Sequence, residues 1–292
     1  MFKGLFTAII TPFKEDETID EEALRKLIDF NIKNGVSGIV PCGTTGESPT
    51  LSAEEHLRVI EITVQQVAGR VPVIAGTGSN CTKKTIETTQ KAEALGINGA
   101  LVVNPYYNKP TQEGLYQHFK AVANSVKIPI VVYNIKGRTG VNVETSTLMR
   151  LVNDCKNIVA VKEASGNMEQ MKEVIAQRPK GFSVLSGDDG LTLELIKNGG
   201  NGVVSVASNL LPKKMSELTS EALNGNFDKA EKLNKKLEKF FNAEFIETNP
   251  IPIKYMVSLK GRCKEVYRLP MCSLTAVSKQ KINELMSEMN LI

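Results

Sequence analysis

The sequence of 292 residues predicts an α/β fold, a (β/α)8 TIM barrel that carries a C-terminal helical appendage. Three observations carry this prediction. Short apolar runs rich in β-branched residues recur along the chain, a helix-period amphipathic segment follows each run, and eight such units occur in succession. Successive strand–helix units favour a parallel sheet, and eight of them are typical of a closed barrel.

The predicted strands are taken in chain order, and amphipathic helices separate them. The strands are expected at residues 6–10, 38–40, 73–77, 99–103, 129–134, 158–162, 182–186 and 202–206, with helices such as 21–34, 53–68, 82–95 and 113–126. Asp20 and Ser52 are suited to N-caps, while Gly35, Gly69 and Gly96 follow helix ends. A doubly wound dinucleotide-binding sheet is disfavoured, because the first strand and its loop, residues 7–13, contain no Gly.

The strand pattern stops near Asn226. From there, apolar residues recur at helical spacing, namely Phe227, Ala230, Leu233, Leu237, Phe241 and Phe245. We therefore predict that residues 1–225 form a catalytic barrel and that residues 226–292 form a helical region packed on the barrel or on a partner subunit. No Pro- or Ser-rich linker separates the two, so one compact unit is expected.

Composition and charge argue against several classes of partner. The net charge of +4 is spread along the chain, and the densest basic stretch, residues 229–239, alternates Lys with Glu like a solvated helix face, so no nucleic-acid site is expected. No apolar stretch approaches the roughly 20 residues that span a bilayer, and the strand-like start is unlike a signal peptide. The five Cys form no C-x-x-C pair. We expect reduced thiols, no metal site and a cytoplasmic location.

Lys162 is the most informative residue, because it ends the apolar run 158–161 and precedes a polar loop that contains Gly166. Burial lowers the pKa of an ammonium group and can turn an amine into a nucleophile that forms a Schiff base. A strand-end lysine that reaches into solvent is the alternative for this segment alone.

In a barrel, the loops that follow the strands carry the chemistry. Two Gly flank Thr44 and Thr45 after the second strand, which suits a carboxylate or phosphate cradle but also a plain turn. Tyr106 and Tyr107 lie between Pro residues in a rigid loop, suited either to the site or to an interface.

Two further loop positions suit a site that binds acids. Tyr133 shares strand parity with Val131, so we expect its phenol in the barrel mouth beside Lys162, where it is suited to proton transfer. Arg138 lies between two Gly and is suited to a bidentate grip on a carboxylate, although a lone Arg is more often part of a surface ion pair.

Two further polar features have simpler interpretations. Asp188 and Asp189 suggest a metal or an acid–base pair, but Asp before a helix is ordinarily a cap, and we expect capping here. His56 has no nearby ligand partners in the sequence, so metal binding is not expected. An amine, a phenol, hydroxyls and a guanidinium at strand ends together indicate Schiff-base chemistry on a small keto acid, with no metal or organic cofactor.

At this point the motifs resemble a known family. They are residues 43–47 (Gly-Thr-Thr-Gly-Glu), 105–110, Tyr133-Asn134 with 138–140, 161–166 and 247–250. In this combination the chain resembles, over its whole length, the 4-hydroxy-tetrahydrodipicolinate synthases, or dihydrodipicolinate synthases, of the pyruvate-dependent class I aldolase superfamily. The resemblance implies a lyase of lysine and diaminopimelate biosynthesis that joins pyruvate to aspartate 4-semialdehyde, usually a homotetramer built as a dimer of dimers.

The resemblance also implies roles for individual residues. Lys162 forms the Schiff base with pyruvate. Thr44, Tyr107 and Tyr133 form a proton relay, with Tyr107 supplied by the adjacent subunit. The substrate-binding positions are Thr45 for the pyruvate carboxylate, Arg138 for the semialdehyde carboxylate, and Gly187 and Val204 along the pyruvate pocket.

The chain departs from the family pattern in two places. Ile135-Lys136 stands where a Pro usually precedes the Arg loop, which frees φ and adds a charge near Arg138. Ser48, His56, Asn80 and Tyr106 match the lysine-binding cleft of inhibited members, but Pro49 differs, and Ala53 and Lys84 replace a His and a Glu. Lys84 would repel an ammonium ligand, so weak or absent lysine inhibition is expected.

Two other functions stay open from the sequence. A sister aldolase acting on sialic or keto-deoxy sugar acids would share the Lys and Tyr, although Arg138 and the Tyr106–Tyr107 pair favour a short carboxylated aldehyde. A non-catalytic metabolite-binding barrel is the alternative from another class.

Overall fold

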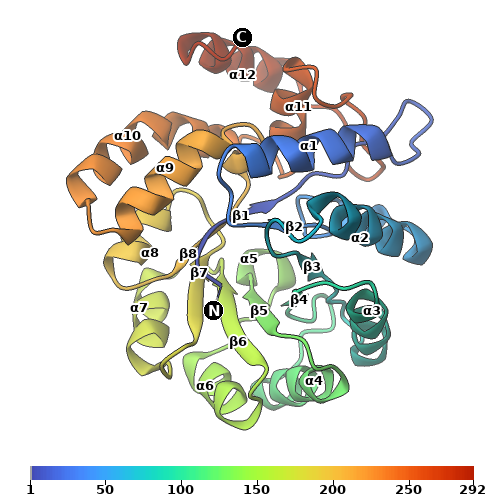
Figure 1. The fold of residues 1–292 in the computed structure, drawn as a ribbon, viewed down its shortest axis with the longest axis vertical. Helices are drawn as coiled ribbons and strands as arrows, with labels where there is room; N and C mark the ends of the chain where they lie inside the picture. The colour runs from blue at the N-terminus through green and yellow to red at the C-terminus, as the bar shows by residue number, and fades with distance from the viewer. Residues whose placement is uncertain (1) are drawn as a thin grey trace.

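The computed structural model describes residues 2–292 and contains eight parallel strands arranged around a barrel (Figure 1). The strands are β1 (Gly4–Ala8), β2 (Gly38–Val40), β3 (Ile74–Gly76), β4 (Gly99–Val103), β5 (Ile130–Asn134), β6 (Ile158–Glu163), β7 (Ser183–Ser186) and β8 (Gly202–Ser205). Their order is β2-β1-β8-β7-β6-β5-β4-β3, and a parallel bridge between Ile39 and Val73 joins the two edges. The predicted (β/α)8 barrel is therefore confirmed.

Helices alternate with the strands and form the outer layer. They are α1 (Glu21–Lys33), α2 (Ala53–Val67), α3 (Thr82–Ala94), α4 (Gln112–Ser125), the short α5 (Lys136–Thr139), α6 (Thr145–Asp154), α7 (Met168–Gln177), α8 (Thr192–Lys197) and α9 (Pro212–Leu223). The predicted caps are confirmed, because Asp20 accepts from the Ala23 amide and Ser52 accepts from the Glu55 amide.

The largest boundary error in the strand prediction is at β1, which ends at Ala8 and not at Ile10. Ile9 still donates its amide hydrogen to the Val40 carbonyl, but Ile10 donates to the side-chain oxygen of Asn209. A side chain 199 residues away thus takes the place of the strand ladder, and hydrophobicity alone does not reveal such a switch.

The barrel has two apolar layers. Inside it, alternate strand residues pack together, namely Phe6, Ala8, Val40, Ile74, Leu101, Val131, Tyr133, Ala160, Leu185 and Val204. A larger core fills the space between strands and helices. Because side chains alternate along a strand, a residue two positions after an inward residue also faces inward. Tyr133 follows Val131 in this way and Lys162 follows Ala160, so β5 and β6 both direct a polar group into the barrel.

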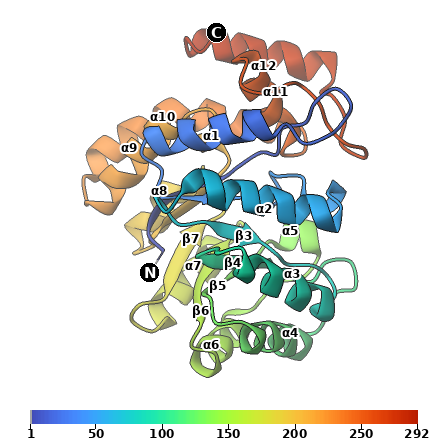
Figure 2. The same ribbon diagram turned by 45° about the vertical axis from the view of Figure 1, so that its right-hand side comes forward.

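Three further helices follow the barrel, namely α10 (Phe227–Ala243), α11 (Ile251–Leu259) and α12 (Ala276–Glu288). In both ribbon views α10 lies beside α9, and α11 and α12 lie beyond α1 (Figures 1 and 2). The predicted apolar stripe is only partly buried, since Ala230 and Leu237 are covered whereas Phe227 and Phe245 are 36% and 49% exposed. Phe245 lies beyond the end of α10.

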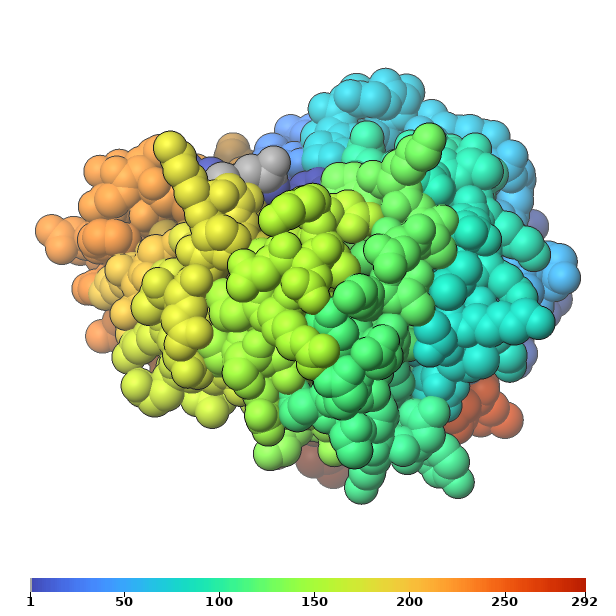
Figure 3. Space-filling model, turned by 90° about the horizontal axis from the view of Figure 1, so that it is seen from below, coloured from blue at the N-terminus to red at the C-terminus, as the bar shows by residue number. Residues whose placement is uncertain are grey.

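Seen from the side of α4 and α6, the side chains of the helical layer cover the barrel (Figure 3). Among residues 2–292, no helix combines the length and the apolar character needed to cross a bilayer.

Candidate active site

Lys162 lies inside the barrel near the carboxyl end of β6. Lys162 is only 6% exposed, and its Nζ lies 4.2 Å from the ring centroid of Tyr133. The two residues are direct neighbours in the ladder between β5 and β6. The barrel register therefore brings the amine and the phenol together, as the strand parity of the sequence predicts.

Gly187 provides the room that the Lys162 side chain occupies. A Cβ atom at this position would lie 2.9 Å from Lys162 Cε and 2.6 Å from the Cβ of Ala164. The Gly187 amide also donates to the Glu163 carbonyl at 2.7 Å, which fixes the loop after β7 against β6. Only a glycine fits here without displacing its neighbours.

The loop after β2 forms a tight turn. The amides of Gly46 and Glu47 donate to the carbonyls of Gly43 and Thr44, so these two amides are used within the turn. The Thr11 hydroxyl donates to the Gly46 carbonyl at 2.7 Å and ties the turn to the segment after β1. The buried Thr45 and the half-buried Thr44 present the hydroxyls that the sequence singles out.

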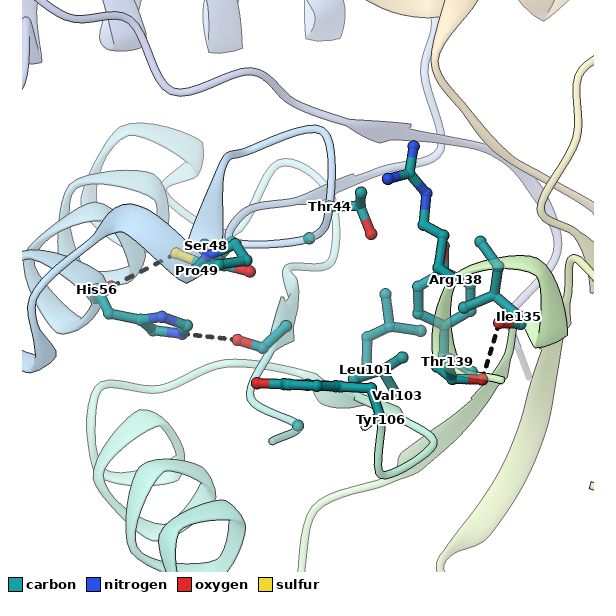
Figure 4. Close-up of a pocket in the computed structure, with 15 residues that line it drawn as sticks. Thr44, Ser48, Pro49, His56, Leu101, Val103, Tyr106, Ile135, Arg138 and Thr139 are labelled. Atoms are coloured by element: carbon teal, nitrogen blue, oxygen red, sulfur yellow. Dashed lines mark hydrogen bonds between the residues drawn. The ribbon is translucent and has the colours of Figure 1, made fainter. Parts of the chain in front are cut away.

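A cavity of about 300 Å3 opens at the carboxyl ends of the strands. Thr44, Tyr133 and Arg138 all line it, and the close-up shows Thr44 and Arg138 extending into the same space (Figure 4). Lys162 is not one of the lining residues, but its amine lies against the ring of Tyr133, which does line the cavity. A phenol, a hydroxyl and a guanidinium from three different loops or strand ends thus meet at the cavity, and an amine lies next to the phenol ring.

Arg138 belongs to the one-turn helix α5, which begins directly after Ile135. Its Nη2 donates to the Asn249 carbonyl at 3.0 Å, while the residue as a whole is exposed. Among residues 2–292, Arg138 takes part in no ion pair with an acidic side chain, which was the alternative interpretation. Lys136 is exposed at the start of α5, and Ile135 lines the cavity.

The aromatic pair after β4 divides between the cavity and the surface. Tyr106 lines the cavity and is 38% exposed. Tyr107 is 89% exposed and has a φ of 72°, a left-handed conformation that is uncommon for a bulky residue. Within this chain, Tyr107 does not line the cavity with Thr44 and Tyr133.

Of the four residues that the resemblance matches to a lysine-binding cleft, three line this cavity and Asn80 does not. Ser48, His56 and Tyr106 line the cavity, and His56 Nε2 lies 2.7 Å from the Gly76 carbonyl oxygen (Figure 4). Burial lowers the pKa of His56. The carbonyl of Asn80 accepts a hydrogen bond from Asn108.

Ala53 and Lys84 line a neighbouring cavity of about 360 Å3, in which His56 also takes part. Lys84 is exposed. Lys84 thus places an ammonium group at a cavity that His56 also lines.

The expected capping role of Asp188 and Asp189 is wrong. Helix α8 has no side-chain cap, and the buried Asp189 instead accepts from the amides of Val206 and Ala207, directly after β8. It thereby fixes the segment that follows Val204, which lies on β8 in the inner layer. The buried carboxyl of Glu244 lies against Asp189, and both burial and this acidic neighbour raise the pKa of Glu244.

Sequence reasoning assigned no role to Asn249, although it lies in one of the motifs. Its side-chain amide donates to Thr45 Oγ1 at 3.1 Å, and its carbonyl accepts from Arg138. Sequence reasoning also missed an ion pair between Lys254 and Glu47. The charged atoms lie 2.6 Å apart, and the two side chains are 0% and 1% exposed. A polar Asn–Pro step and a single Lys within the apolar run 251–257 were the available signals.

Within the part of the chain that the structure describes, no group of three or more His, Cys, Asp or Glu side chains is arranged to hold a metal ion. The groups that lie near one another are an amine, a phenol, hydroxyls and a guanidinium. This set suits covalent attack on a carbonyl of a small acid.

Comparisons with known proteins agree with the geometry. Residues 1–289 match the model of the dihydrodipicolinate synthetase family. The chain is 54% identical over 292 residues to the 4-hydroxy-tetrahydrodipicolinate synthase of Syntrophus aciditrophicus, with both sequences fully covered. The crystal structure of the Aquifex aeolicus dihydrodipicolinate synthase superposes with a TM-score of 0.98 at 48% identity, covering 99% of each chain. A Cyanidioschyzon merolae relative with lysine bound has a TM-score of 0.97 at 40% identity and covers 100% of this chain and 99% of its own.

Proposed function

We propose that Lys162 is the covalent catalyst of this chain, which belongs to the dihydrodipicolinate synthetase family and carries out the family's reaction, the condensation of pyruvate with aspartate 4-semialdehyde in lysine biosynthesis. The observation that supports this assignment most directly is the buried amine of Lys162 beside the Tyr133 ring. The other buried lysine among residues 2–292 is Lys254, whose amine is already paired with Glu47.

The first stage is the formation of an imine. The Lys162 amine adds to C2 of pyruvate, and loss of water gives an iminium ion. In this proposal the Thr45 hydroxyl donates to the pyruvate carboxylate. Tyr133 transfers protons to and from the reacting oxygen and nitrogen, and Thr44 and a Tyr107 from a second subunit continue the relay.

The second stage forms the carbon–carbon bond. The iminium draws electrons from the adjacent methyl group, which loses a proton to give an enamine. The enamine carbon attacks the aldehyde carbon of the semialdehyde, whose carboxylate is held by Arg138. The amino group of the semialdehyde then attacks C2, closes the ring and releases the Lys162 amine. None of these reaction steps consumes an oxidant or a reductant.

Borohydride trapping tests the assignment. Pyruvate and borohydride together are expected to add one reduced pyruvyl group, on Lys162 alone, and Lys162→Ala is expected to add none. An unchanged mass of the parent chain, or an adduct that persists in Lys162→Ala, would refute the covalent role. Turnover with aspartate semialdehyde compared with sugar aldehydes separates this function from that of a sister aldolase.

The assembly is proposed to be a homotetramer built from two dimers, in which Tyr107 enters the site of the neighbouring copy. The support is that Tyr107 is 89% exposed in a single chain although it sits on a loop that begins at the cavity. A cytoplasmic location is proposed because all five cysteines are free thiols.

Lysine is proposed to inhibit this chain weakly or not at all. The support is the ammonium group of Lys84 beside the cavity that His56 and Ala53 line, because like charges repel a cationic ligand.

A further inference from the structure

Asn249 connects the two carboxylate-binding groups of the site, although it lies far from both in the sequence. It is separated by 204 residues from Thr45 and by 111 residues from Arg138. It lies between α10 and α11, outside the eight strand–helix units, and is 5% exposed. One buried residue of the C-terminal region therefore contacts both binding groups.

The two contacts use different parts of Asn249. The side-chain Nδ2 donates to Thr45 Oγ1 at 3.1 Å, whereas the backbone carbonyl accepts from Arg138 Nη2 at 3.0 Å. Substitution of the side chain therefore removes the first contact and leaves the acceptor of the second in place. This separation makes the two halves of the arrangement independently testable.

The direction of the Thr45 hydrogen bond determines what Thr45 offers to a substrate. A hydroxyl has one donor hydrogen and two acceptor positions. Because the Asn249 amide occupies an acceptor position, the single hydrogen of Thr45 stays available for a carboxylate. An Asp at position 249 would instead accept that hydrogen and add a negative charge beside the substrate acid.

The segment that carries Asn249 is held to the same turn at a second point. Lys254, five residues further on in α11, pairs with Glu47, which directly follows Gly46 of the turn. The Tyr267 hydroxyl donates to the Ile251 carbonyl at 3.0 Å and supports the start of α11. Asn249 is thus fixed relative to Thr45 by contacts other than its own.

We propose that Asn249 is a positioning residue that orients the Thr45 hydroxyl toward the pyruvate carboxylate through its side chain and holds Arg138 through its backbone. This inference rests on the proposed function, because it takes Thr45 and Arg138 as the groups that bind the two acids. According to this inference, the Asn249 side chain affects the binding of pyruvate, and its substitution leaves the binding of the semialdehyde unchanged.

Steady-state kinetics of Asn249→Ala and Asn249→Asp test this division in the full chain. We expect the KM for pyruvate to rise several-fold in Asn249→Ala and by about tenfold or more in Asn249→Asp, since hydrogen bonds to charged groups are the stronger kind. The KM for aspartate semialdehyde is expected to stay within twofold in both. The matched controls are Asn242→Ala and Asn242→Asp, at an exposed asparagine of α10, where no kinetic change is expected.

A double-mutant cycle separates positioning from general loosening of the fold. In a Thr45→Val background the Asn249→Ala effect on the pyruvate KM should disappear, because the hydroxyl that Asn249 orients is gone. An effect of Asn249→Ala that persists in that background, or equal increases in both KM values, would overturn the proposal. If Asn249→Ala does not fold, the same cycle with Asn249→Ser decides the matter.

Borohydride trapping distinguishes failure of this inference from failure of the proposed function. Absence of a pyruvyl adduct on Lys162 in the parent chain would remove the proposed function, and this inference with it. An intact adduct together with an unchanged pyruvate KM in both Asn249 variants would overturn only the role of Asn249.

Discussion

The ion pair between Lys254 and Glu47 allows a quantitative test of how α11 is held to the turn after β2. Lys254 Nζ lies 2.6 Å from Glu47 Oε1, and both side chains are shielded from water. The other carboxylate oxygen, Glu47 Oε2, has no hydrogen-bond partner within residues 2–292. The Lys254 ammonium also lies 4.1 Å from the Phe13 ring centroid. Burial lowers the pKa of Lys254, and the neighbouring carboxylate opposes this effect.

The perturbation is Lys254→Met, which keeps an unbranched apolar side chain and removes the charge. Glu47 must then remain charged without a partner or take up a proton. Protonating a glutamate of ordinary pKa ≈ 4.3 costs about 3.7 kcal/mol at pH 7 and about 1 kcal/mol at pH 5. Breaking a buried ion pair by removing one partner costs about 3–5 kcal/mol. We therefore expect a loss of about 3–4 kcal/mol at pH 7 and about 1 kcal/mol at pH 5.

Urea unfolding at the two pH values measures this loss. All variants are compared at the same protein concentration, since association shifts apparent stability. The double variant Glu47→Gln/Lys254→Met removes both charges and is expected to recover most of the lost stability. Lys264→Met is the control, because the Lys264–Glu15 pair is exposed and its loss should not be measurable.

Two outcomes would refute the reasoning. A loss in Lys254→Met that is the same at pH 5 and pH 7 would show that lost packing, and not the stranded carboxylate, causes the destabilisation. A double variant as unstable as the single variant would show that the two charges are not coupled.

Three further predictions concern the site and its surroundings. Gly187→Ala should slow pyruvyl-adduct formation on Lys162 at least tenfold in borohydride trapping, because the added methyl group would overlap the lysine side chain; an unchanged rate would contradict this. The Glu244 carboxyl beside Asp189 has a raised pKa in the folded protein. Its contribution to the free energy of unfolding is therefore fully present below the ordinary carboxyl pKa and is lost as the pH rises toward the raised value. Thermal unfolding of Glu244→Leu between pH 5 and 9 should therefore show a flatter decline than the parent, and parallel curves would argue against it. Initial rates of the parent should be insensitive to low-millimolar lysine, whereas the Lys84→Glu variant should be inhibited more strongly. A several-fold loss of parent activity at low-millimolar lysine would refute this.

Much of the fold follows from local sequence patterns. Each βα unit buries one apolar strand and one helix face, and both faces produce periodicities that a sequence displays. Strand parity also predicts that Tyr133 and Lys162 converge, since both follow inward residues by two positions. Errors arise where a distant side chain replaces a local partner. Asn209 ends the β1 ladder early, and Asp189 binds the amides after β8 and not the helix that follows it.

The parts of the site that the sequence does not reveal are those built by contacts across about 200 residues. Asn249 and Lys254 contact the turn after β2 across separations of 204 and 207 residues in the sequence. Contacts over such separations produce no periodic pattern of residues. Their signal is chemical: residues 251–257 of α11 are all buried, so a lysine among them requires a charged partner in the interior. The turn at residues 43–47 follows the second strand and ends in a buried carboxylate, Glu47, that can supply this partner. The predicted boundary at residue 226 stays a prediction, and the turn after β2 is held by residues from both sides of it.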